Sequence, residues 1–229
     1  MYTAILLAAG SGSRAELGYN KVLYTLSQKP VFMWSLEQFL AQPECKQVLI
    51  VTQEAEIDTF TDLLEVFQVL DPRIEFVVGG SERQESVHNA LHKTSQPYVL
   101  IHDAARPFIN QEQLSTLYEH VQADEAVILA VPAKDTIKQV ENGVIEQTHE
   151  RQKMYLAQTP QAFATKLIMQ AHHHAVTMEI QATDDASLIE QLCLRGVHVV
   201  AGSYVNMKVT TPEDFVIAEA LIEGGMIQS

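Results

Sequence analysis

Small residues and cations gather in the run from Leu7 to Arg14 (LAAGSGSR), which directly follows the first apolar stretch. Glycines there let the backbone approach a phosphate closely, and successive N–H groups form an anion-binding concavity. Arg14 has a forked guanidinium that can hold two phosphate oxygens, and Lys21 follows as a second cation. No Gly-Lys-Ser/Thr follows, so this is not a P-loop, and Ala15 takes the third glycine position of the dinucleotide motif. The pattern predicts a phosphate-binding loop, with a simple turn as the alternative.

Two further runs follow predicted strands. Gly79 to Ser86 (GGSERQES) lies where open α/β sheets bind ligands; the alternative is a loop in which Ser81 caps the next helix. The run from His102 to Pro107 (HDAARP) ends a strand. The Asp103 carboxylate is therefore expected to face the same crevice at the strand ends and to hold a metal or a substrate hydroxyl. A buried pair of Asp103 with Arg106 is the alternative there.

Cations for a second anion lie later in the chain. Arg151 and Lys208 lie near or within the polar runs KDT, QTPQ and NMKVT, and each by itself is typical of an ordinary surface residue. Together they could supply positive charge for a second phosphate. The triplet from His172 to His174 is different, because consecutive residues point around a helix whereas metal ligands need i, i+4 spacing. It predicts a solvated helix surface.

Composition narrows the class of protein. The 229 residues carry a net charge of −14, which disfavours nucleic-acid binding as the main role. Cys45 and Cys193 have no CxxC partner, so neither a metal site nor a disulfide framework is indicated. No run approaches the roughly 18 apolar residues of a membrane span, and the first strand lacks the basic flank of a signal peptide. We expect a cytoplasmic protein with one domain over residues 1–229 and no membrane partner.

Short apolar runs alternate with amphipathic segments, which predicts an α/β fold: a mostly parallel sheet with helices on both faces. The predicted strands are Ala4–Ala8, Val48–Thr52, Ile74–Val78, Tyr98–His102, Ala126–Val131 and Val197–Ala201. The predicted helical faces are Phe32, Leu36, Phe39 and Leu40; Phe60, Leu63, Leu64, Phe67 and Leu70; and Leu114, Leu117, Tyr118 and Val121. A last helix begins at Thr211 as N-cap, with Pro212 in its first turn.

One segment interrupts this alternation. Lys134–Val140 and Val144–Thr148 flank an Asn142-Gly143 dipeptide, which is a strong hairpin signal. A polar hairpin is a poor core element, so we expect a β-arm over about residues 134–150 that clasps a partner subunit. A loose, exposed hairpin is the alternative.

The set of motifs resembles the cytidylyltransferases of the non-mevalonate isoprenoid pathway, which join 2-C-methyl-D-erythritol 4-phosphate to CTP. The similarity runs from about Ala4 to Leu221. Its marks are AAGSGSR from Ala8, GG with Arg83 and SV from Ser86, HDAARP from His102, DTIK from Asp135, QTPQ from Gln158, TDDAS from Thr183 and MKVT from Met207. The chain departs from many relatives at Leu7, Ala15 and Asn20, where they carry Pro, Met and Pro; these changes remove no charged group.

The resemblance implies a Rossmann-like, nucleotide-diphospho-sugar transferase-like fold and a homodimer formed through the β-arm. It implies that CTP is held by Ala8, Ala9, Gly10, Gly80, Ser81 and Ser86, with Ala104 also in the binding set. Arg14 and Lys21 would stabilise the transition state. The methylerythritol phosphate would be positioned by Asp103, Arg106, Thr136, Arg151, Thr159 and Lys208, some of them from the partner's arm. Mg²⁺ would bridge the phosphates with few protein ligands, which the resemblance does not identify.

Three other functions are weighed against this one. A D-ribitol 5-phosphate cytidylyltransferase would share the loop and the Asp-containing strand end, but that group tends to carry Val where this chain has Ala105. A non-catalytic nucleotide sensor would not need the second pair of cations, Arg151 and Lys208. Nicotinamide-dependent hydride transfer is disfavoured by the missing third glycine.

Overall fold

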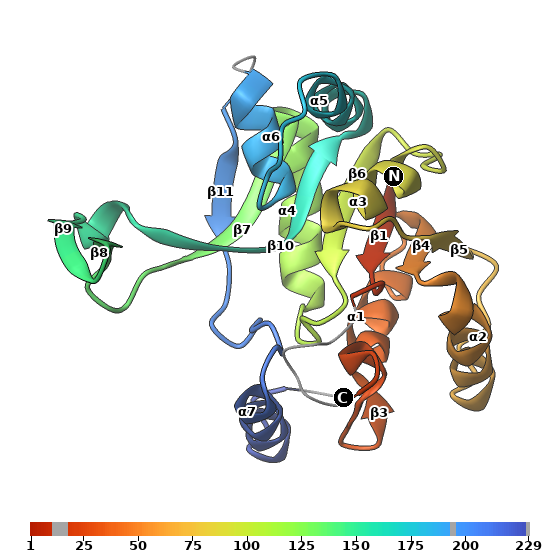
Figure 1. Cartoon of the computed structure of the whole chain (residues 1–229). Helices are drawn as coiled ribbons and strands as arrows, with labels where there is room; N and C mark the ends of the chain where they lie inside the picture. Colours follow the sequence, from red (N-terminus) through yellow and green to blue (C-terminus); the bar gives the residue numbers. More distant parts are fainter. Residues whose placement is uncertain (11–17, 193–195, 228–229) are drawn as a thin grey trace.

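The computed structural model describes residues 1–10, 18–192 and 196–227, and its centre is one seven-stranded sheet (Figure 1). The strand order is β11-β7-β10-β6-β1-β4-β5. The strands are β1 (Tyr2–Leu7), β4 (Cys45–Thr52), β5 (Ile74–Val78), β6 (Tyr98–Asp103), β7 (Ala126–Pro132), β10 (Tyr155–Ala164) and β11 (His198–Ala201). Each neighbouring pair is parallel except where β10 runs antiparallel to β6 and β7. The predicted, mostly parallel α/β architecture is confirmed.

Helices cover both faces of the sheet, because alternate residues of the central strands enter two different apolar clusters. Leu6, Ile50 and Leu100 face one cluster, and Ile5, Leu49 and Ile101 face the other. The first cluster is closed by α1 (Val31–Leu40), α2 (Ile57–Val66), α4 (Gln111–Asp124) and α7 (Pro212–Glu223). The second is closed by α3 (Arg83–Leu91), α5 (Thr165–Thr177) and α6 (Asp185–Leu192). None of the helices within the described residues is long and apolar enough to cross a membrane.

Most predicted helix signals are confirmed. Thr211 and Asp214 form a capping box at the start of α7, with Pro212 as its first residue. Leu70 was wrongly assigned to the face of α2, since that helix ends at Val66 and the Leu70 side chain lies beyond it, 73% exposed. The short strands β2 (Thr25–Leu26) and β3 (Lys29–Pro30) were also not predicted.

The sequence also gave no indication of β10, the longest strand of the sheet. Its first part, Tyr155–Ala157, pairs with β7 in one register, and Gln161 resumes the pairing after a register shift. Between the two registers lies Gln158-Thr159-Pro160, whose two polar residues and proline interrupt the apolar pattern that identifies a strand. Its neighbours β6 and β7 hold this segment in place between them.

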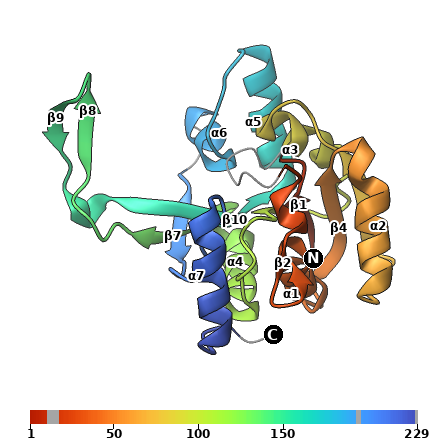
Figure 2. The ribbon, with the colours of Figure 1, turned by 60° about the horizontal axis from the view of Figure 1, so that its bottom comes forward.

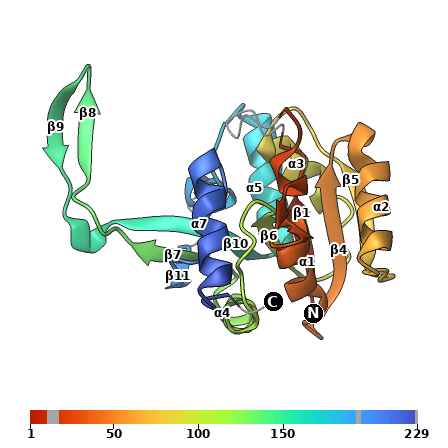
Figure 3. The same ribbon diagram turned by 90° about the horizontal axis from the view of Figure 1, so that it is seen from below.

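The predicted β-arm is present and leaves the body of the molecule, as Figure 2 and Figure 3 show. It consists of β8 (Lys138–Glu141) and β9 (Val144–Thr148), which pair antiparallel. Asn142 and Gly143 both have positive φ (49° and 79°), as a tight hairpin turn requires. All residues of the two strands are exposed, Ile145 by 58%.

Candidate active site

A cavity of about 610 Å³ opens where four parallel strands end. Leu7 ends β1, Gln53 follows β4, Gly80 follows β5 and Asp103 ends β6, and all four line the cavity. The carboxyl ends of parallel strands meet at one edge of a sheet, which explains why motifs far apart in sequence converge here. The lining residues are Leu7, Ala9, Gly10, Asn20, Lys21, Val22, Gln53, Gly80, Ser81, Glu82, Arg83, Ser86, Asp103, Ala105 and Lys208.

The first glycine-rich loop is anchored at both described ends. The buried Asn20 amide donates to the Ala8 carbonyl at 2.6 Å and to Glu56 Oε2 at 2.9 Å, while its oxygen accepts from Val22 N at 3.3 Å. These bonds hold the short 3₁₀ helix that begins at Lys21 beside the loop's start. Asn20, where many relatives carry proline, therefore provides side-chain hydrogen bonds that a proline could not make. Arg14 lies outside the described residues.

The second glycine-rich loop packs tightly against the first. A Cβ on Gly79 would lie 2.7 Å from the Ala9 Cβ, so a side chain at this position would push the two loops apart. The Gly80 N–H donates to Ser86 Oγ at 3.0 Å. Ser81 N–H donates to Glu85 Oε2 at 2.7 Å, and the helix cap is Glu82, so the capping role considered for Ser81 is wrong. Backbone and small side chains thus form one wall of the cavity.

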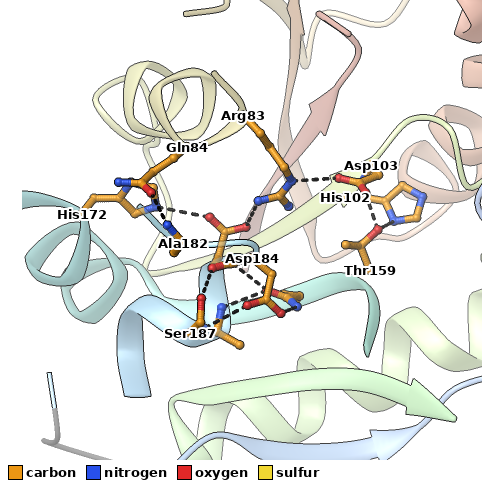
Figure 4. Close-up of polar contacts among 12 residues, drawn as sticks. Arg83, Gln84, His102, Asp103, Thr159, His172, Ala182, Asp184 and Ser187 are labelled. Carbon is orange, nitrogen blue, oxygen red and sulfur yellow. Dashed lines mark hydrogen bonds and ion pairs between the residues drawn. The ribbon is translucent and has the colours of Figure 1, made fainter. Parts of the chain in front are cut away.

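The cavity lining also includes an ionised carboxylate between two cations. Asp103 Oδ1 accepts from Arg83 Nε at 3.2 Å (Figure 4). Its Oδ2 accepts from Lys208 Nζ at 2.6 Å. Burial opposes ionisation, but Arg83 and Lys208 outweigh it and hold the pKa of Asp103 well below its usual range. The buried ion pair of Asp103 with Arg106, the alternative drawn from the sequence, does not form. The Arg106 guanidinium donates instead to the Asn206 carbonyl at 2.8 Å.

A chain of hydrogen bonds behind Asp103 fixes its backbone. The Asp103 N–H donates to Thr159 Oγ1 at 3.0 Å, Thr159 Oγ1 lies 3.1 Å from His102 Nδ1, and His102 Nε2 lies 2.9 Å from the Arg106 carbonyl. All three contacts are satisfied when His102 is neutral with its proton on Nε2, so that the Thr159 hydroxyl donates to Nδ1. Burial lowers the pKa of His102 to about 4, which keeps this tautomer uncharged near neutral pH.

The predicted site residues other than Arg14 divide into three groups. The cavity is lined by Ala9, Gly10, Lys21, Gly80, Ser81, Ser86, Asp103 and Lys208. Directly behind it lie Ala8, Ala104, Arg106 and Thr159, which are buried or half-buried. Thr136 and Arg151 lie off the cavity, exposed near the β-arm, where Arg151 Nη1 donates to the Lys134 carbonyl at 2.9 Å.

Sequence reasoning missed the importance of Arg83 and misplaced His172. Arg83 joins two carboxylates, since its Nη1 also donates to Asp185 Oδ2 at 2.8 Å. His172 is 1% exposed and its Nε2 lies 3.3 Å from Asp185 Oδ1, so the predicted solvated position is wrong. Ile168 and Ala175 lie on the same buried face of α5, and this i, i+4, i+7 spacing was the signal that could have placed His172 inside.

No group of three or more His, Cys, Asp or Glu side chains that could hold a metal occurs in the described part of the chain. Both oxygens of Asp103 are already taken by cations. A nucleoside triphosphate carries the oxygen ligands that Mg²⁺ prefers, so Mg²⁺ held mainly by substrate phosphates and water fits these residues.

Residues of two glycine-rich loops and a carboxylate paired with two cations line one cavity at the edge of a mostly parallel sheet, which is the arrangement of α/β nucleotide-binding enzymes. A profile of the 2-C-methyl-D-erythritol 4-phosphate cytidylyltransferases (IspD) matches residues 2–224. The relative of that name from Bacillus thuringiensis is 42% identical over 97% of this chain and 98% of its own; that from Halalkalibacterium halodurans is 43% identical over 96% of each. The crystal structure of 4-diphosphocytidyl-2C-methyl-D-erythritol synthase from Anaerococcus prevotii aligns with a TM-score of 0.88 at 31% identity, over 97% of this chain and 96% of that one. The chain belongs to the 2-C-methyl-D-erythritol 4-phosphate cytidylyltransferase family, and it is a nucleotidyltransferase.

His102 predicts a window of pH-dependent stability. Its pKa is about 4 in the folded protein against 6.5 for an unburied histidine, so the unfolded chain binds more protons between these values. The free energy of unfolding should therefore fall by about 3 kcal/mol as the pH drops from 6.5 to 4. Urea denaturation across this range measures it. In His102→Gln the loss should shrink, and an unchanged slope would show that other groups cause it; buried acids such as Asp103 titrate at lower pH.

Proposed function

We propose that this protein transfers a cytidylyl group from CTP to 2-C-methyl-D-erythritol 4-phosphate, giving 4-diphosphocytidyl-2-C-methyl-D-erythritol and pyrophosphate. The single observation that carries the proposal is the pairing within one cavity of an anion cradle beside Lys21 with an Asp103–Lys208 pair. The cradle suits the triphosphate, and the Asp103–Lys208 pair suits a phosphorylated polyol.

Chemistry requires the two anions to meet. An oxygen of the 4-phosphate attacks the α-phosphorus of CTP, the new P–O bond forms, and the bond to the β-phosphate oxygen breaks to release pyrophosphate. A phosphate monoester is already a nucleophile near neutral pH, so positioning and charge neutralisation supply most of the catalysis. Lys21 and Arg14 would stabilise the charge on the transferring phosphoryl group. Asp103, held ionised, would accept hydrogen bonds from polyol hydroxyls while Lys208 attracts the phosphate.

Magnesium would be held mainly by the triphosphate and water rather than by a protein cage. When bound it would neutralise charge on the phosphates. The residues that surround it would be the backbone of the first loop and Lys21, which approach the phosphates from the protein side.

A homodimer would complete the site. Thr136 and Arg151 lie off the cavity of their own chain, and the arm between them exposes Val140, Val144 and Ile145 by 54%, 68% and 58%. We infer that the arm packs on a partner and delivers its Thr136 and Arg151 to the partner's cavity. Burial of those apolar side chains would supply the driving force.

Ala105 favours methylerythritol phosphate over ribitol phosphate. It lines the cavity two residues after Asp103 and is 5% exposed, so a valine there would narrow the acceptor side. The small side chain leaves space for the branched methyl group of the methylerythritol. Support for the acceptor also comes from the names of the relatives given above.

The decisive assay is pyrophosphate release from CTP and Mg²⁺ with each acceptor. We expect kcat/KM for methylerythritol 4-phosphate to exceed that for ribitol 5-phosphate by about tenfold or more, and EDTA to abolish release. A preference for ribitol 5-phosphate would reassign the acceptor. If neither acceptor leads to pyrophosphate release although CTP binds, the sensor hypothesis is supported.

Removing a cation from the nucleotide side should slow chemistry. Lys21→Ala and Arg14→Ala should each lower kcat by about 100-fold or more, because charge on the transferring phosphoryl group loses its partner. Steady-state kinetics measures this, and thermal unfolding checks that folding is little affected. Lys46→Ala, which removes an exposed lysine of β4, is the matched control. Near-wild-type turnover in Lys21→Ala would refute the role given to Lys21.

The arm predicts an oligomeric state. Light scattering should give twice the 25.5 kDa chain mass at micromolar concentration. Ile145→Asp should dissociate the dimer and lower turnover, because Thr136 and Arg151 would then be lost from the partner's site. Val66→Asp, at a position on α2 that is 73% exposed, should do neither. A wild-type monomer would contradict this proposal.

A further inference from the structure

Arg83 is the link between the cavity and a second, fully buried carboxylate. Its guanidinium donates through Nε to Asp103 at 3.2 Å and through Nη1 to Asp185 at 2.8 Å. Only 1% of the Asp185 side chain is exposed, compared with 12% for Asp103. Arg83 itself lines the cavity, whereas Asp185 does not.

Side chains from three elements, β10, α5 and α3, hold the backbone and the carboxylate of Asp185 in place. Its backbone N–H, at the start of α6, donates to Gln161 Oε1 on β10 at 3.1 Å, and the next N–H, of Ala186, donates to the same oxygen at 3.0 Å. Its Oδ1 lies 3.3 Å from His172 Nε2 on α5, which leaves Oδ2 for Arg83. Burial opposes ionisation of Asp185, but Arg83 and His172 outweigh it and lower its pKa. A fixed negative charge therefore stands behind Arg83.

From this geometry we infer that Asp185, oriented by His172 and Gln161, is a positioning residue that sets the placement of Arg83 and through it the Asp103 carboxylate that faces the acceptor. It touches neither substrate. With Asp185 in place, the guanidinium is divided between two carboxylates and gives Asp103 a single hydrogen bond. Without it, Arg83 is free to turn its whole fork onto Asp103 and compete with Lys208 and the acceptor hydroxyls.

A purely electrostatic role makes a different prediction. Removing any nearby negative charge would help both anionic substrates to bind, so both KM values would fall. A positioning role acts through Asp103 and therefore weakens the acceptor alone. Asp184 provides the matched control, because it is an aspartate one residue earlier whose oxygens accept from Ser187 N and Gln161 Nε2 rather than from Arg83 (Figure 4). In Asp184→Asn the remaining side-chain oxygen can still accept from Gln161 Nε2, so Gln161 keeps its contacts with the start of α6.

The test measures both KM values and kcat for Asp185→Asn and Asp184→Asn, using the full chain with CTP and methylerythritol 4-phosphate. Asp185→Asn should raise the acceptor KM by about tenfold, the size of one lost charge-assisted hydrogen bond, and leave the CTP KM within about twofold. Asp184→Asn should leave both within about twofold. Asp185→Glu, which keeps the charge, should restore most of the acceptor affinity.

A double-mutant cycle with Arg83→Lys identifies the route. Lysine keeps the charge but cannot bridge two carboxylates with a planar fork. In that background Asp185→Asn should change the acceptor KM by less than about twofold, whereas additive effects would overturn the inference. Equal rises in both KM values, no rise at all, or the same rise in Asp184→Asn would also overturn it.

Loss of a buried carboxylate can prevent folding, so a second variant removes the orienting contact instead. His172→Leu takes away the donor to Asp185 Oδ1 and should raise the acceptor KM by about threefold at an unchanged CTP KM. An unchanged acceptor KM in a folded His172→Leu protein refutes the inference even if Asp185→Asn cannot be made. The inference rests on the proposed function, but the two can fail separately. If the wild-type protein does not turn over methylerythritol 4-phosphate, the proposed function is refuted. If the wild-type protein turns it over and the Asp185 variants have an unchanged acceptor KM, only the positioning role is refuted.

Discussion

An ionised carboxylate held almost out of water is the interaction on which the rest of the site depends. A buried charge is costly unless it is paired and hydrogen-bonded. Asp103 meets this condition with one cation on each oxygen, Arg83 from α3 and Lys208 from the segment before α7. The two cations lie 125 residues apart in the chain, so the carboxylate joins parts of the structure that only folding brings together. The same pairing keeps Asp103 an acceptor, which suits recognition of hydroxyl groups.

The antiparallel strand β10 serves the site as much as it serves the sheet. Thr159 accepts the Asp103 N–H, its carbonyl accepts from the Asn206 amide at 2.9 Å, and Gln161 holds the start of α6. The register shift in β10 places this polar run between β6 and β7 at the end of β6. Interrupted pairing thus provides hydrogen-bonding groups where a regular strand would have offered only ladder contacts.

The charge at the cavity differs from the net charge of the chain. The chain is strongly acidic overall, yet three cations, Lys21, Arg83 and Lys208, line the cavity. Local cations and backbone N–H groups outweigh the general field because electrostatic interactions at short range are screened least. The arm, by contrast, is apolar at several exposed positions and has no place in the cavity of its own chain.

Local chemistry along the chain was enough to predict the alternating architecture, the two glycine-rich loops, the Asn142-Gly143 hairpin and the Asp103 strand end. Each of these depends on residues within a few positions of one another: apolar periodicity, turn-forming glycines, and a strand followed by small residues. The partners of Asp103 and the position of β10 could not be predicted in this way, whereas the burial of His172 had a local signal in its spacing from Ile168 and Ala175. Arg106 is near Asp103 in sequence, but the strand end directs it to Asn206, while Arg83 and Lys208 approach from other elements. A motif can be recognised from residues that are neighbours in the chain. Which charged side chains pair depends on which strand ends lie at the same edge of the sheet, and only the tertiary structure determines this.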